Sequence, residues 1–110
     1  MMTIRLYVLQ RITALIMAPL VLGHIAVMIY AVQGGLSAAE ILGRTQGSLF
    51  WALYYGSFVL AVAIHAAIGL RVILFEMFKI NGTPLNLLAW AVAISLLFMG
   101  GRAVYAVTAL

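Results

Sequence analysis

The stretch VAIHAAIGLRVILFE, residues 62–76, decides how the rest of the chain is interpreted. It places His65 in the middle of an apolar run that is long enough to cross a bilayer. An ionisable side chain inside a membrane is costly, so such residues are candidates for function by default. Ala61 and Gly69 lie four residues to either side of His65, on the same helical face, and keep that face free of bulk. A histidine on a cleared face is suited to axial ligation of a haem iron.

The composition of the chain is that of a membrane protein. Of its 110 residues, 67% are hydrophobic and 7% are charged, which is too few polar residues to cover a soluble domain. The sequence predicts an all-α membrane protein with one three-helix transmembrane domain, residues 1–110, and spans at about residues 6–32, 49–78 and 85–107. Three helices enclose little space, so we expect burial of a large cofactor to need a partner. The lack of cysteine excludes thiolate ligands and iron–sulfur clusters bound by this chain.

The connecting segments carry turn and capping signals. Gly-Gly at residues 34–35 is expected to end the first span. The segment SAAE at residues 37–40 has capping-box spacing and predicts a short interfacial helix over residues 38–42. NGTP at residues 81–84 predicts a tight turn between the second and third spans. Pro19 predicts a kink in the first span.

The basic residues are divided unequally between the two sides of the predicted bundle. The side of the N-terminus has four, and the other side has two: Arg5, Arg11, Arg71 and Lys79 against Arg44 and Arg102. This asymmetry predicts the N-terminus inside and the C-terminus outside. It offers no basic cluster for nucleic acid. No presequence is evident, which favours the bacterial inner (cytoplasmic) membrane, with the mitochondrial inner membrane as the alternative.

The two histidines are expected at different depths. His24 lies roughly 20 Å beyond Arg11 along the first span, and His65 lies roughly 9 Å from Arg71 on the second. If the two arginines share an interface, the imidazoles differ in depth by roughly 10 Å and do not bind one iron. Either each histidine meets a partner's histidine at its own level, giving two haems, or only one is a ligand. The alternative for either is a buried histidine that only forms a hydrogen bond to a neighbouring helix.

Three charged residues have two interpretations each. Arg11 and Arg71 are either interfacial anchors or donors to haem propionates or a quinone carbonyl. Arg71 lies about 240° around the helix from His65, so the haem face is not its natural target. Glu76 is either a proton acceptor in quinone reduction or an ion-pair partner of Lys79 or Arg71.

Two short motifs resemble the membrane anchors of succinate dehydrogenase and fumarate reductase. RITA at residues 11–14 resembles their Arg-x-Thr-Gly/Ala element. IHAAIG at residues 64–69, with Glu76 eleven residues after the histidine, resembles their His-x-x-x-Gly…Asp haem helix. The resemblance covers nearly all of the chain and is closest to the hydrophobic, cytochrome b-type D subunit.

The resemblance implies one subunit of a four-part complex of the tricarboxylic acid cycle and respiratory chain. In that family an FAD flavoprotein interconverts succinate and fumarate, and an iron–sulfur subunit relays electrons. Two hydrophobic anchors hold haem b and a quinone site. The chain alone is then expected to perform no carbon chemistry, and to pass electrons between the iron–sulfur subunit and quinone.

The resemblance also assigns roles by motif position. His65 corresponds to the haem-ligand histidine, Arg11 to the arginine near the quinone and propionates, and Glu76 to the aspartate of the motif. The family's quinone-binding tyrosine is replaced by Met77, while Tyr7 stands where the sister anchor has a serine and is a candidate quinone contact. Family members with two haems carry a histidine in the first span as well, a variant that His24 fits.

Two other functions remain open at this stage. The chain could be a haem b anchor for fumarate reductase or another quinone-linked dehydrogenase, because a different subunit selects the substrate. It could also be a haem-free structural membrane subunit whose histidines and arginines contact only neighbours or lipid. Ligation of haem by His65 distinguishes the second function from the others.

Overall fold

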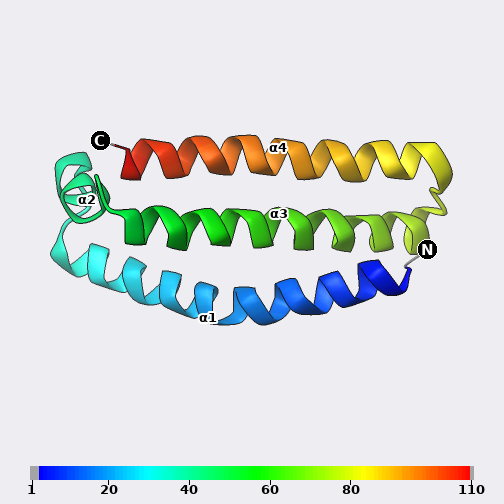
Figure 1. The fold of residues 1–110 in the computed structure, drawn as a ribbon, viewed down its shortest axis with the longest axis horizontal. Helices are drawn as coiled ribbons and strands as arrows, with labels where there is room; N and C mark the ends of the chain where they lie inside the picture. The colour runs from blue at the N-terminus through cyan, green and yellow to red at the C-terminus, as the bar shows by residue number, and fades with distance from the viewer. Residues whose placement is uncertain (1–2, 110) are drawn as a thin grey trace.

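Four helices make up the computed structural model, which describes residues 3–109. In chain order they are α1 (Ile4–Gly34), α2 (Ala38–Thr45), α3 (Leu49–Phe78) and α4 (Gly82–Thr108). Three of them, α1, α3 and α4, are long and apolar enough to cross a membrane. Figure 1 shows these three side by side with α3 between α1 and α4, and the two ends of the chain at opposite ends of the bundle. The all-α, three-span prediction is confirmed.

Small residues on α3 let both neighbouring helices approach it. Ala61, Ala63 and Ala67 are buried, and Ala63 is fully inaccessible. Small side chains at helix contacts are the usual means of close packing in membranes. The outer faces of α1 and α4 remain exposed and apolar, with residues such as Leu15 and Tyr105 each 75% exposed. Most of this surface is therefore left for lipid or for other subunits.

The predicted range of the middle span agrees with α3, whereas the ends of the other helices differ from the predicted ranges by up to three residues. The middle span coincides with α3, and α1 ends at Gly34 with Gly35 as its cap at φ 124°. The turn predicted at residues 81–84 is wrong in position: α4 already begins at Gly82, and the turn lies at Lys79–Asn81, where Lys79 has φ 58°. Pro84 fits in the first turn of α4 because the amide hydrogens there have no partner within the helix.

The short second helix begins as predicted and continues further. Ser37 caps α2 by accepting a hydrogen bond from the Glu40 amide at 3.2 Å, and its hydroxyl donates to the Glu40 carboxylate at 2.7 Å. The helix extends to Thr45, whose hydroxyl donates to the Val107 carbonyl of α4 at 2.6 Å. This hydrogen bond to α4 stabilises the last turn of α2, and the sequence of α2 alone does not predict it.

Pro19 lies inside a continuous α1. Figure 1 shows this helix bent in its middle part. A proline within a helix removes one backbone hydrogen bond and commonly bends the helix. The bend separates two halves of α1, which are named after the orientation that the charges predict: the inner half contains Thr13 and the outer half contains His24.

Candidate functional site

His65 lies against α1 and contacts a buried hydroxyl group. Its Nδ1 atom is 3.1 Å from the Oγ1 atom of Thr13. Thr13 is 3% exposed, and its Oγ1 also lies 2.9 Å and 3.0 Å from the carbonyl oxygens of Leu9 and Gln10. The Nε2 atom of His65 has no hydrogen-bond partner among residues 3–109 and is not fully buried. One ring nitrogen is thus occupied and the other is free.

Ala61 and Gly69 lie on the same face of α3 as His65. Ala61 is 4% exposed. A Cβ atom at Gly69 would lie 3.5 Å from the side-chain nitrogen of Gln10. Within this chain Gly69 leaves room for Gln10 of α1 and Ala61 is buried, and the expected role of both residues in packing against a haem stays a prediction.

His24 lines a cavity in the outer half of the bundle. The cavity has a volume of about 450 Å³ and is lined mainly by apolar residues of α3 and α4. The rings of Tyr55 and Phe58 meet the imidazole edge-on, with centroids at 6.0 Å and 5.5 Å. Its Nδ1 atom is buried without a hydrogen-bond partner among residues 3–109. The alternative interpretation, that His24 only forms a hydrogen bond to a neighbouring helix, has no support within the described part of the chain, because no such bond is present there.

The two histidines lie at different levels of the bundle. His65 is level with Thr13, and His24 is eleven residues further along α1, or roughly 16 Å. The partners of His24 on α3, Tyr55 and Phe58, likewise precede His65 by ten and seven residues. One iron cannot be reached by both imidazoles from these positions.

Arg71 lies in a second, smaller cavity of about 230 Å³ at the other end of the bundle. Leu6 and Leu9 of α1 and Trp90 of α4 contribute to its walls. The guanidinium donates a hydrogen bond from Nη1 to the side-chain oxygen of Asn86, while its Nε atom is buried and has no partner among residues 3–109. Arg71 is thus a cation that is hydrogen-bonded to Asn86 in the wall of an apolar cavity.

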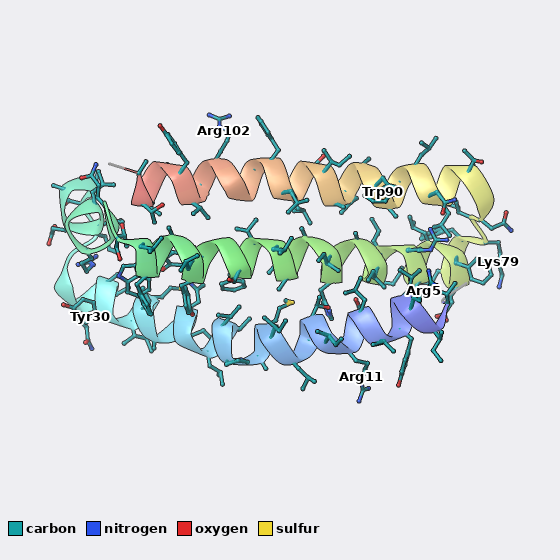
Figure 2. All side chains as sticks on the ribbon, viewed as in Figure 1. Arg5, Arg11, Tyr30, Lys79, Trp90 and Arg102 are labelled. Carbon is teal, nitrogen blue, oxygen red and sulfur yellow. The ribbon has the colours of Figure 1, made fainter. Side chains whose placement is uncertain are left out.

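The other predicted quinone residues lie elsewhere. Figure 2 shows Arg11 on α1 pointing away from α3. Its guanidinium lies 5.9 Å from the ring centroid of Tyr7, within the range of a cation–π contact. Glu76 is exposed near the end of α3, and Arg71 pairs with Asn86 in its place. The structure does not bring Arg11 and Tyr7 together with Arg71 in one pocket of this chain.

Sequence reasoning missed the contacts that surround the two histidines. Thr13 belongs to the RITA segment, yet its hydrogen bond to His65 was not predicted. The ring of Tyr55 packs on His24, a contact that was not predicted from the sequence either. A polar side chain within an apolar span indicates that the residue has a partner. It does not indicate which residue of a neighbouring helix that partner is.

Comparison with known families gives one match that covers most of the chain. The family model described as succinate dehydrogenase/fumarate reductase transmembrane subunit matches residues 2–101. The chain belongs to this family. It is accordingly an integral membrane subunit of the succinate dehydrogenase/fumarate reductase type, a family whose members work in complexes with other subunits. Neither the comparison with curated proteins nor the comparison with solved structures gave a significant match.

Proposed function

We propose that this anchor subunit binds haem b through Nε2 of His65, with a histidine of a second hydrophobic subunit as the other axial ligand. The observation that carries the proposal is the free Nε2 of an imidazole whose other nitrogen is held inside the bundle. A metal-bound histidine usually forms a hydrogen bond through its second nitrogen in this way. When bound, haem b supplies a one-electron Fe(III)/Fe(II) couple, and the chain positions it between the iron–sulfur subunit and quinone.

The quinone headgroup binds, in this proposal, near Arg71. A terminal Nη–H group of Arg71, rather than the buried Nε–H, donates to a quinone carbonyl in this proposal, and the apolar walls of the 230 Å³ cavity suit the ring. Arg11 points away from α3, and with Tyr7, whose ring it contacts, it binds propionates or quinone together with the partner anchor in this proposal. Glu76 lies further toward the same end and accepts a proton during quinone reduction.

His24 is the proposed ligand of a second haem. Its unpaired Nδ1 and the 450 Å³ cavity beside it support a ligand at this level, because ordinary ligand sites have volumes in this range. The separation from His65 along the bundle requires a second iron. This haem also requires a histidine from the partner anchor.

The proposed setting is a complex with an FAD flavoprotein, an iron–sulfur subunit and a second anchor, in the bacterial inner membrane with the N-terminus inside. Catalysis at succinate or fumarate belongs to the flavoprotein. The family assignment and the three spans support this setting. The competing proposals are an anchor for another quinone-linked dehydrogenase and a haem-free structural subunit.

The decisive measurement is haem b per FAD in the detergent-purified complex for wild type, His65→Ala and His24→Ala. Two haems per FAD, with each substitution removing a different one, support both ligand assignments. One haem that is lost with His65→Ala and kept with His24→Ala restricts the proposal to His65. Full haem in both variants contradicts it and favours the structural subunit.

The quinone proposal is tested with Arg71→Gln and Arg11→Gln. We expect Arg71→Gln to raise KM for a soluble quinone tenfold or more, because a charged donor to the carbonyl contributes about 1.5–3 kcal/mol. Transfer of electrons from succinate to an artificial acceptor that takes them from the soluble subunits should stay unchanged in both variants. An unchanged KM in Arg71→Gln would remove Arg71 from the quinone site.

A further inference from the structure

The Thr13 hydroxyl is held in a position that determines how His65 can form hydrogen bonds. Its oxygen lies within 3.1 Å of three groups: the Leu9 carbonyl, the Gln10 carbonyl and Nδ1 of His65. Thr13 is 3% exposed, so these protein atoms are the partners available to it. Threonine is branched at Cβ and adopts few rotamers in a helix, which keeps the hydroxyl in this place.

The donors and acceptors of this cluster can be counted. A threonine hydroxyl has one hydrogen and two lone pairs, and a carbonyl oxygen only accepts. The two carbonyl oxygens are the closer neighbours of Oγ1, at 2.9 Å and 3.0 Å, and donation from threonine to the i−4 carbonyl is a common arrangement within helices. With the hydrogen directed to the carbonyls, a lone pair faces Nδ1, and the 3.1 Å separation suits an N–H···O bond.

We infer that Thr13 is a positioning residue that holds His65 as the Nδ1–H tautomer and so presents an unprotonated Nε2 to a ligand outside the chain. In neutral imidazole one nitrogen carries the hydrogen and the other carries the lone pair, so fixing the first fixes the second. The same bond restrains rotation of the ring, because Thr13 is itself attached to the backbone of α1. Helix α1 thereby orients a ligand that α3 carries.

The consequence for iron concerns ligand strength as well as orientation, and it rests on the proposed haem ligation by His65. An Nδ1–H that donates to oxygen makes the imidazole a stronger electron donor, which favours Fe(III) over Fe(II). Loss of the bond is expected to raise the reduction potential of the haem. Removal of such a partner commonly weakens metal binding by about 10- to 100-fold.

The tautomer is tested directly by ¹⁵N NMR of ring-labelled histidine in the full chain in lipid nanodiscs without haem. His65→Gln identifies the His65 signals. We expect Nδ1 protonated and Nε2 unprotonated in wild type and in Thr13→Ser, and a mixture of both tautomers in Thr13→Val, which keeps the shape and removes the hydroxyl. A wild-type chain with the hydrogen on Nε2 overturns the inference, even if Thr13→Val fails to fold.

The effect on haem is tested in the purified complex by haem content and by redox titration of the His65 haem. Thr13→Val should weaken haem binding by about 10- to 100-fold and raise the potential, while Thr13→Ser should resemble wild type. Thr108→Val is the matched control, because Thr108 is a buried threonine that donates to a backbone carbonyl, that of Val104, at the opposite end of the bundle. Equal effects of Thr13→Val and Thr108→Val would reduce Thr13 to a structural role.

The two proposals fail in different ways. Full haem in His65→Ala contradicts ligation by His65, whatever the tautomer in the free chain. Haem lost in His65→Ala but bound normally, at an unchanged potential, in Thr13→Val contradicts the role of Thr13 and leaves the ligation in place.

Discussion

Arg11 and Thr13 both belong to the RITA segment, and they lie on opposite sides of α1. Positions two apart on an α-helix are separated by about 200°, so the two side chains point in nearly opposite directions. Thr13 is buried against His65, whereas Arg11 points outward over Tyr7. The sequence allowed the motif to be recognised. It could not assign Thr13 to His65, because nothing in α1 alone specifies which residue of α3 lies opposite.

Two adjacent glycines on α4 offer a prediction about packing. A Cβ atom at Gly100 would collide with both methyl groups of Val59 on α3, whereas nothing lies within 4 Å of a Cβ at Gly101. Val59 is branched at Cβ and cannot easily turn aside. We expect Gly100→Ala to be less stable than Gly101→Ala by about 1–3 kcal/mol in the free energy of unfolding in mixed-detergent micelles.

Because both substitutions replace glycine by alanine within the same helix, the gain in helix propensity cancels in their difference. Equal stability of the two variants would show that α3 and α4 can separate at this level without cost.

Helix α1 is attached to α3 by two side-chain hydrogen bonds among the described residues. One joins Thr13 to His65 in the inner half, and the other runs from the Tyr54 hydroxyl to the Leu20 carbonyl at 2.6 Å in the outer half. The other contacts between α1 and α3 are packing contacts, including those of the His24 ring with two aromatic rings of α3, and in lipid no hydrophobic driving force strengthens them. The position of α1 therefore depends on a few polar contacts.

A second prediction concerns removal of the hydrogen bond between the Tyr54 hydroxyl and the Leu20 carbonyl. Tyr54→Phe should lower the free energy of unfolding by about 0.5–1.5 kcal/mol and speed amide hydrogen exchange in the outer half of α1. Tyr105→Phe is the control, because Tyr105 is 75% exposed and makes no such bond. Faster exchange in the inner half alone would contradict this assignment.

The elements were predictable where hydrophobicity alone defines them. The span at residues 49–78 coincides with α3, and the Gly-Gly stop ends α1 where expected. The prediction failed where a tertiary contact or a cap decides: α2 extends to Thr45, which bonds to α4, and α4 begins before Pro84. Likewise the candidate site residues could be found from the sequence, because ionisable side chains are energetically unfavourable in a membrane. Which of them lie together depends on how each helix is rotated about its axis, which the sequence does not specify.

At the scale of the whole molecule, the charges predict the orientation in the membrane. Figure 2 shows Arg5 and Lys79 at one end of the bundle, and Tyr30 at the other. Because the chain has no cysteine, single cysteines can report which side is exposed. With the N-terminus inside, Gly43→Cys should react with an impermeant thiol reagent in right-side-out vesicles, and Asn81→Cys only after the membrane is permeabilised.

Both positions are exposed, so access to the residue itself does not limit labelling. Labelling of Asn81→Cys alone in sealed vesicles would contradict the predicted orientation.

The bonds between the first loop and the end of α4 have a consequence for synthesis of the chain. Thr45 donates to the Val107 carbonyl, and the Gly47 amide donates to the Thr108 carbonyl at 2.9 Å. These partners are separated by about sixty residues, so the ribosome must release the third span before the loop can close. Until α4 has been synthesised, the Thr45 hydroxyl and the Gly47 amide therefore lack these two carbonyl partners, and the connection between α1 and α3 gains these contacts last.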